Sequence, residues 1–506
     1  MAVSASALPC ASMLGELRRL GRETMVYGLS TVVGRLLNFL LLPLYTHCLA
    51  PADYGVVATI FTYIGLCNIL YSHGMDFAFM RFSRTSSDTG DFSTPFWSLL
   101  TTSLVFSGLI HLCAGPLAAL ALVPPELADI IRYSAWIMAL DALCLVPFAE
   151  LRLTHKPAAY AGIKVANIIL NIALNYVFLV KLAMGVRGVF LASLITACAT
   201  FAMVAPVLWL RLEPRFDRKL FPQLLRFALP LVPAGLASMM VQVIDRPILQ
   251  RLTDDATVGI YQANYRLGIF MMMVVNMFDA AWRPFFIQRA AEPGHQEVLA
   301  RVLTYFAVGA AFLFLAVTFF IPDFAALRLL RGKTLIHPAY WAGLGIVPVV
   351  TLAYLFNGVY VNLLAPVTLA KRTDLVAGAT ATGAAVNILS NLLLIPRWGL
   401  MGAALATLFA YMAMAAALFL MGRRVYPLTY EYRRLGHAGA CLVLSAGAFW
   451  SWGRPIVPFH DVILRLGLLA SFPALLLATG FFDEEELAAL KDALRRCPGW
   501  PGSPSG

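Results

Sequence analysis

The chain has 506 residues, of which 60% are hydrophobic and only 13% are charged, and its formal net charge is +11. Soluble domains carry roughly 45–50% apolar and about 25% charged residues, so this composition excludes a soluble globular protein. The long, unalternating apolar runs also exclude an outer-membrane β-barrel, whose strands are about 9–11 residues long. The positive charge is typical of cytoplasmic loops in membrane proteins and does not indicate nucleic-acid binding.

The apolar runs predict an all-α polytopic membrane protein with about 14 transmembrane helices. The first 24 residues are predicted to be a cytoplasmic segment, because they lack the basic start and apolar run of a signal peptide. Six predicted helices then cover residues 25–47, 54–74, 96–122, 128–148, 158–180 and 186–210. Beyond a basic cytoplasmic linker, six more cover 227–249, 258–278, 302–321, 340–364, 375–395 and 399–421. The last two cover 437–452 and 462–482.

Lys and Arg are distributed unevenly between alternate loops. With the N-terminus inside, the inner segments hold 24 of these residues and the outer loops hold 9. Inner loops of membrane proteins collect Lys and Arg, so this asymmetry predicts that both termini are cytoplasmic, in a bacterial inner membrane. The tail over 483–506 is then a cytoplasmic segment.

Three short segments recur in the same order in the two halves of the chain. Residues 54–55 match 258–259 at an offset of 204, and Asp76 matches Asp279 at an offset of 203. Residues 185–193 match 399–407 at an offset of 214. The pattern predicts a duplication of six helices, with parallel repeats, as in some transporters. The predicted lobes are an N-lobe over 25–210 and a C-lobe over 227–421. The basic linker over 211–226 separates the lobes, and residues 422–482 carry the two extra helices.

Charged residues inside predicted spans are costly in lipid and therefore indicate a cavity or a charged partner. Arg35, Lys164 and Arg266 are candidate substrate-binding cations. For Lys164 and Arg266, snorkelling to the membrane surface remains an equal alternative. Asp141 is a candidate to pair with a cation or to carry a coupling proton.

Acidic and basic residues also occur together at predicted helix ends. Asp245 and Arg246 precede Pro247, where they form either a gate or ion-coupling element or a structural ion pair at a kink. Asp279 and Arg283 are spaced i, i+4 and can pair on one helix face. The recurrence of this arrangement as Asp76 and Arg81 in the first half suggests an inner gate, and a plain interfacial anchor is the alternative.

No motif for catalysis or cofactor binding stands out. The chain has no H-E-x-x-H and no P-loop, so no metalloprotease site and no ATPase are expected. The eight cysteines occur singly, so neither a metal site nor a disulfide framework is expected. The sequence therefore predicts a protein that is not an enzyme and that needs no cofactor, metal or ATP.

The order of these segments resembles the bacterial polysaccharide and oligosaccharide flippases of the multidrug/oligosaccharidyl-lipid/polysaccharide exporter superfamily. The matching segments are 27–46, 49–55, 74–82, 229–233 with Asp245-Arg246, 258–261 with 281–284, 387–396 and 399–404. The resemblance implies a two-lobed transporter that moves an oligosaccharide on polyprenyl diphosphate across the inner membrane by alternating access. An ion gradient or the membrane potential would drive it, and polysaccharide polymerase and glycosyltransferases are its expected partners.

Three alternatives remain. A multidrug cation antiporter of the same superfamily would favour acidic residues in the spans, whereas cations outnumber acids here. A membrane polysaccharide polymerase or ligase would carry a large periplasmic loop, and the longest outer loop, over 322–339, is short. A scaffold without transport activity is the remaining alternative.

Overall fold

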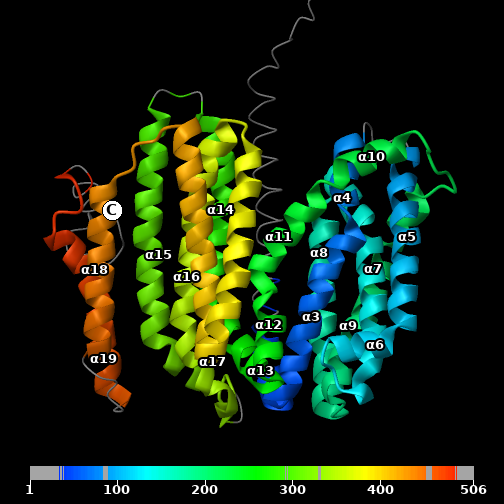
Figure 1. The fold of residues 1–506 in the computed structure, drawn as a ribbon, viewed down its shortest axis with the longest axis horizontal. Helices are drawn as coiled ribbons and strands as arrows, with labels where there is room; N and C mark the ends of the chain where they lie inside the picture. Colours follow the sequence, from blue (N-terminus) through cyan, green and yellow to red (C-terminus); the bar gives the residue numbers. More distant parts are fainter. Residues whose placement is uncertain are drawn as a thin grey trace, which may run out of the picture. The chain divides into compact units, whose positions relative to one another are not determined.

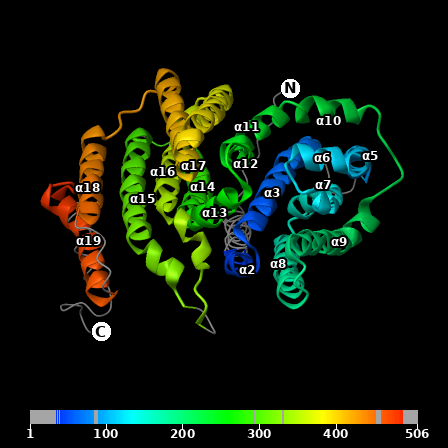
Figure 2. The ribbon, with the colours of Figure 1, turned by 60° about the horizontal axis from the view of Figure 1, so that its bottom comes forward.

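The computed structural model describes residues 34, 37, 39–83, 89–290, 292, 294–328, 332–451, 458–484 and 486. The chain divides into two compact units, and each is described here by itself. Unit 1 comprises Met1–Leu267, Ala325–Val350 and Ala377–Met414, and unit 2 comprises Gly268–Phe324, Thr351–Val376 and Ala415–Gly506. Figures 1 and 2 show the helices of both units from two directions.

The predicted all-α membrane architecture is confirmed. In the described part of the chain, nine helices are long and apolar enough to cross a membrane. The count of 14 is not confirmed, and the first predicted span is described in part only, as α2 (Leu41–Cys48). The predicted N-lobe and C-lobe stay a prediction, because the compact units reflect packing and not the internal repeat.

The N-terminal part of unit 1 contains the helices of the first repeat. After α2 come α3 (Pro51–Ser72), α4 (Met75–Phe82), α5 (Thr89–Leu112), α6 (Ala114–Leu120), α7 (Ala128–Leu153), α8 (Pro157–Tyr176) and α9 (Gly185–Arg211). Helix α7 is central, because it packs against α3, α5, α8 and α9 (Figure 1). Its buried face and the aromatic rings of Phe79, Phe92 and Phe96 form an apolar core.

The helix predicted over 227–249 is broken into pieces. The structure has α10 (Leu220–Ala228), α11 (Leu231–Val243) and α12 (Asp245–Leu252) in its place. Pro247 has no N–H to bond the carbonyl of Val243, which explains why α11 ends there. Unit 1 continues with α13 (Asp255–Tyr265), the 3-10 helices η3 (Arg266–Gly268) and η5 (Pro338–Ile346), and the central part of α17 (Thr373–Val425).

Helix α17 covers both segments that were predicted separately at 375–395 and 399–421. A kink interrupts it at Gly399, where φ is 51° and ψ is −123°. A side chain is strained at such a positive φ, which suits glycine. Pro396, which also lies in this stretch, disfavours a straight helix.

Unit 2 contains α14 (Ile269–Arg289), α15 (His295–Ala326), most of α16 (Val347–Leu369), α18 (Tyr432–Ser451) and α19 (Pro458–Ala478). Helices α18 and α19, which follow the predicted repeats, pack side by side (Figure 2). They also contact α15, because Phe449 stacks on Phe319 at 4.4 Å between ring centroids. The Arg465 guanidinium donates to the Phe319 carbonyl at 3.0 Å and pairs with Asp323.

Candidate functional site

Arg266 lies directly after α13 and points its guanidinium at two buried tyrosine rings. Its central carbon is 5.8 Å from the ring centroid of Tyr45 and 5.9 Å from that of Tyr54. The Tyr45 hydroxyl in turn donates to Asn175 Oδ1 at 3.0 Å. The Arg266 side chain is half-buried, and its Nη1 atom is buried without a hydrogen-bond partner among the described residues.

This environment leaves a cation able to accept an anionic ligand. The two aromatic faces stabilise the guanidinium by cation–π attraction but accept few of its five N–H groups. A buried N–H without a partner costs roughly 1–3 kcal/mol, so a ligand oxygen is favoured there. Guanidinium groups match phosphate and carboxylate oxygens in particular.

Lys164 and Asp141 lie on neighbouring helices, α8 and α7, and their charges interact electrostatically. The Lys164 ammonium is 4.2 Å from the centroid of the Phe148 ring. Both charged side chains are exposed. Asp141 lies 13 residues into α7, or about 20 Å along its axis, so an exposed carboxylate at this depth favours a hydrated cavity over lipid.

Two of the three predicted substrate-binding cations are in the described residues, and they contact different groups. Lys164 lies over the Phe148 ring beside Asp141, whereas Arg266 faces the rings of Tyr45 and Tyr54. Arg35 lies outside the described residues, so its predicted role stays a prediction.

Asp245 and Arg246 form a buried ion pair at the start of α12, with 2% and 6% of their side chains exposed. Arg246 Nη1 is 2.7 Å from the carboxylate and 2.5 Å from the Gln242 carbonyl, and Nε donates to Gln262 at 2.9 Å. The Tyr261 hydroxyl also donates to Asp245. This geometry fits a structural ion pair at a kink, which was one of the two alternatives from the sequence. A role in gating or ion coupling stays a prediction.

The two Asp–Arg pairs predicted at an inner gate differ from each other. In α14 of unit 2, Arg283 Nε donates to Asp279 at 2.7 Å, as the i, i+4 spacing predicts. In α4 of unit 1, Arg81 stacks over the Phe227 ring at 5.0 Å, and the charge of Asp76 interacts with Arg152. Within the described residues, Asp76 and Arg81 therefore form no ion pair, and a gate role stays a prediction for both sites.

A polar ladder joins α8 and α9 within unit 1. Asn167 donates to Thr200 at 2.6 Å, and Asn171 donates to Thr196 at 3.4 Å. Asn175 closes the ladder, because it is fully buried and accepts from Tyr45. In the sequence, Asn171 and Asn175 are four residues apart, as are Asn387 and Asn391, but this spacing does not identify Tyr45 or the threonines as partners.

The second repeat carries a related pair on α17. Asn387 and Asn391 are fully buried. Asn391 Nδ2 donates at 2.9 Å to the backbone carbonyl of Asn387 and at 2.9 Å to its side-chain Oδ1. Asn387 Nδ2 and Asn391 Oδ1 have no partner among the described residues.

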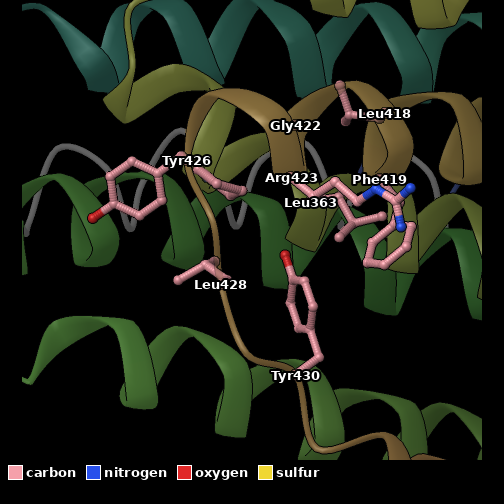
Figure 3. A pocket seen from close by; sticks show the side chains of 9 residues that line it. Leu363, Leu418, Phe419, Gly422, Arg423, Tyr426, Leu428 and Tyr430 are labelled. Atoms are coloured by element: carbon pink, nitrogen blue, oxygen red, sulfur yellow. The ribbon is translucent and has the colours of Figure 1, made fainter.

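A small pocket lies in unit 2 at the end of α17 (Figure 3). Arg423 stacks on the Phe419 ring at 6.0 Å, and the side chains of Tyr426 and Tyr430 flank the pocket. None of the predicted site residues lines it. Among the described residues, no group of three or more His, Cys, Asp or Glu side chains is arranged to bind a metal ion.

Comparison with known proteins agrees with this architecture. Residues 46–286 match the family model described as "Polysaccharide biosynthesis protein". No curated protein matches the chain by sequence.

Solved structures share the fold at low sequence identity. The lipid II flippase MurJ in an inward closed conformation is 15% identical, with a TM-score of 0.71 over 89% of this chain and 98% of that chain. An inward-facing multidrug resistance MATE transporter of the MOP superfamily is 18% identical, with a TM-score of 0.62 over 77% and 94%. An outward-facing MATE transporter of that superfamily is 16% identical, with a TM-score of 0.54 over 79% and 95%. The family match over residues 46–286 agrees with the predicted resemblance, and the solved structures show that this chain shares the fold of a lipid II flippase and of MATE transporters.

Proposed function

We propose that this protein is a flippase that moves an oligosaccharide linked to polyprenyl diphosphate across the bacterial inner membrane. The observation that carries the proposal is Arg266, a guanidinium with a buried, unpartnered N–H between two tyrosine rings. A diphosphate supplies the oxygens that this group lacks. The match to a polysaccharide-biosynthesis family and the fold shared with a lipid II flippase support the same substrate class.

The cargo head group is polar and anionic, so it needs a hydrated, cationic route through the bilayer. Lys164 and Asp141 are exposed at membrane depth and suit such a route. In this proposal, Lys164 contributes to charge neutralisation in addition to Arg266 and Arg35, and the lobes rock to give alternating access. An ion gradient or the membrane potential supplies the energy, and both termini are cytoplasmic. Polysaccharide polymerase and glycosyltransferases act on either side of the transport step, and the protein itself is not an enzyme.

The direct test is flipping of a fluorescent polyprenyl-diphosphate oligosaccharide in proteoliposomes. Arg266→Ala should reduce the initial rate by about tenfold or more, which corresponds to about 1.4 kcal/mol of lost binding. Arg266→Lys should retain part of the activity, because the charge remains but the fork is lost. Arg372→Ala is the matched control, because it removes an exposed cation that pairs with Asp374.

Unchanged flipping by Arg266→Ala would remove this residue from the substrate site. Efflux of cationic dyes without flipping of the labelled lipid would favour the multidrug antiporter. Extension of the oligosaccharide by the purified protein would instead identify a polymerase.

A further inference from the structure

Helices α3 and α13 cross in unit 1 with almost no space between their backbones. A Cβ atom on Gly55 would lie 1.8 Å from the carbonyl oxygen of Asp255. A Cβ atom on Gly259 would lie 1.9 Å from the carbonyl oxygen of Pro51. Both distances are far below any van der Waals contact, so only glycine permits this approach at either position.

The crossing is symmetric between the two predicted repeats. Pro51 and Asp255 are the first residues of α3 and α13, and Gly55 and Gly259 are the fifth. Each glycine therefore packs on the first residue of the other helix. The offset is 204 residues for both pairs, which is the offset of the sequence repeat. One contact thus joins equivalent points of the two halves, on the predicted periplasmic side.

Buried aromatic and polar groups surround the crossing. Tyr54 is 1% exposed and packs edge-to-face on Tyr340 at 6.0 Å. The Tyr340 hydroxyl donates to the Leu49 carbonyl at 3.0 Å, and its own carbonyl accepts from Asn264 at 2.8 Å. Gly343 approaches Asn264 closely as well, since its Cβ would lie 2.4 Å from Nδ2.

The crossing is suited to separate and to form again. Glycine contacts let helices meet backbone to backbone in a membrane, without interlocking side chains. Neither glycine carries a side-chain charge, and the hydrogen bonds from Tyr340 to the Leu49 carbonyl and from His47 to the Thr334 carbonyl join segments of different repeats without a carboxylate. Such a contact closes tightly and opens without breaking a salt bridge.

We infer that Gly55 and Gly259 form the closing seam of the outer gate, which seals the periplasmic side while the cargo site is open to the cytoplasm. This inference rests on the proposed alternating access. Arg266 follows Gly259 by seven residues, or about 10 Å along the helix, so the proposed phosphate site lies directly below the seam. Tyr54 belongs to both features, because it flanks the crossing and contacts the guanidinium.

The test compares Gly55→Ala and Gly259→Ala with the wild type by hydrogen–deuterium exchange of the purified full chain in lipid nanodiscs. Amides over 52–60 and 255–264 should exchange at least about tenfold faster in each variant, because an added methyl group prevents closure. Gly108→Ala and Gly162→Ala are matched controls, because their added Cβ atoms would meet nothing within 4 Å. Neither control should change exchange at the crossing.

Tyr340→Phe provides a milder variant that keeps the ring and removes the bond to Leu49, so it should accelerate exchange less. Unchanged amide exchange at the crossing in both glycine variants would overturn the inference that the two glycines form a seam. Faster exchange with normal flipping of labelled lipid would overturn its role as a gate. If the wild-type protein flips no lipid, the proposed function fails, whereas the exchange result still reports whether the seam exists.

Discussion

Replacing Arg246 by alanine should destabilise the protein strongly, because the change strands a buried carboxylate. Asp245 is 2% exposed and would keep the Tyr261 hydroxyl as its remaining described donor. Breaking a buried ion pair by removing one partner costs about 3–5 kcal/mol. That cost corresponds to a factor of at least about 100 in the unfolding equilibrium constant.

Replacing the acidic partner of the pair should destabilise the protein less than replacing Arg246. In Asp245→Asn, the guanidinium of Arg246 keeps its bonds to Gln262 and the Gln242 carbonyl and its stacking on the Tyr265 ring at 4.4 Å. About 1–3 kcal/mol is expected for this variant. Combining Asp245→Asn with Arg246→Ala should recover part of the Arg246→Ala loss, because no charge then remains buried.

The assay is equilibrium unfolding of the purified protein in detergent micelles, followed by tryptophan fluorescence. Arg372→Ala again serves as the control, because half of its side chain is exposed, and it should change stability by less than about 1 kcal/mol. A cost below about 1 kcal/mol for Arg246→Ala, together with lost flipping, would refute the structural assignment. The pair would then act as a gate or ion-coupling element.

Three further predictions follow from contacts elsewhere in the chain. Asp279→Asn and Arg283→Gln should each cost about 0.5 kcal/mol or less, because the Arg283 side chain is exposed and that of Asp279 is partly exposed. Silent single variants in a flipping assay would leave the pair an anchor. Backbone N–H groups at the start of α10 lower the pKa of Asp217. The ionised carboxylate therefore stabilises the start of α10 at neutral pH, and this stabilisation is lost as the pH falls through that pKa. Amide exchange of residues 219–221, corrected for intrinsic rates, should accelerate in that acidic window and be insensitive to pH in Asp217→Asn. Arg465→Ala should loosen α19 from α15 at a cost of about 1 kcal/mol, measurable by thermal unfolding, since Asp323 is half exposed.

The sequence predicted long helices well where a single apolar run met no interruption. Helix α7 begins at the predicted residue and ends five residues later than predicted, and α9 agrees within one residue at each end. The end of α11 at Val243 was harder to predict, because a proline such as Pro247 inside an apolar run is compatible with a kink or with a new helix. The two predicted helices at the end of the second repeat form one kinked element for a related reason, since Gly399 bends the chain without ending it.

The candidate site was predictable only in part, because it depends on contacts between distant segments. A charge at membrane depth identifies Arg266 as unusual, but the sequence does not reveal that Tyr45 and Tyr54 lie beside it. The repeat suggested equal roles for Asp76–Arg81 and Asp279–Arg283. Only the second pair has a spacing of four residues, and five residues place Arg81 on a different helix face, where Phe227 meets it.

The ladder between α8 and α9 has an unequal tolerance to substitution on its two sides. The hydroxyls of Thr196 and Thr200 already donate to carbonyls of their own helix, at 2.7 and 2.8 Å. Replacing Asn167 or Asn171 by leucine therefore leaves neither threonine hydroxyl proton without an acceptor, whereas replacing Asn175 would remove the acceptor of the Tyr45 hydroxyl. Replacing Thr196 by valine instead leaves the partly buried Asn171 amide without its described acceptor, which costs free energy. Sequence drift in this helix pair should consequently begin at Asn167 and Asn171, while Asn175 and the threonines of α9 stay fixed.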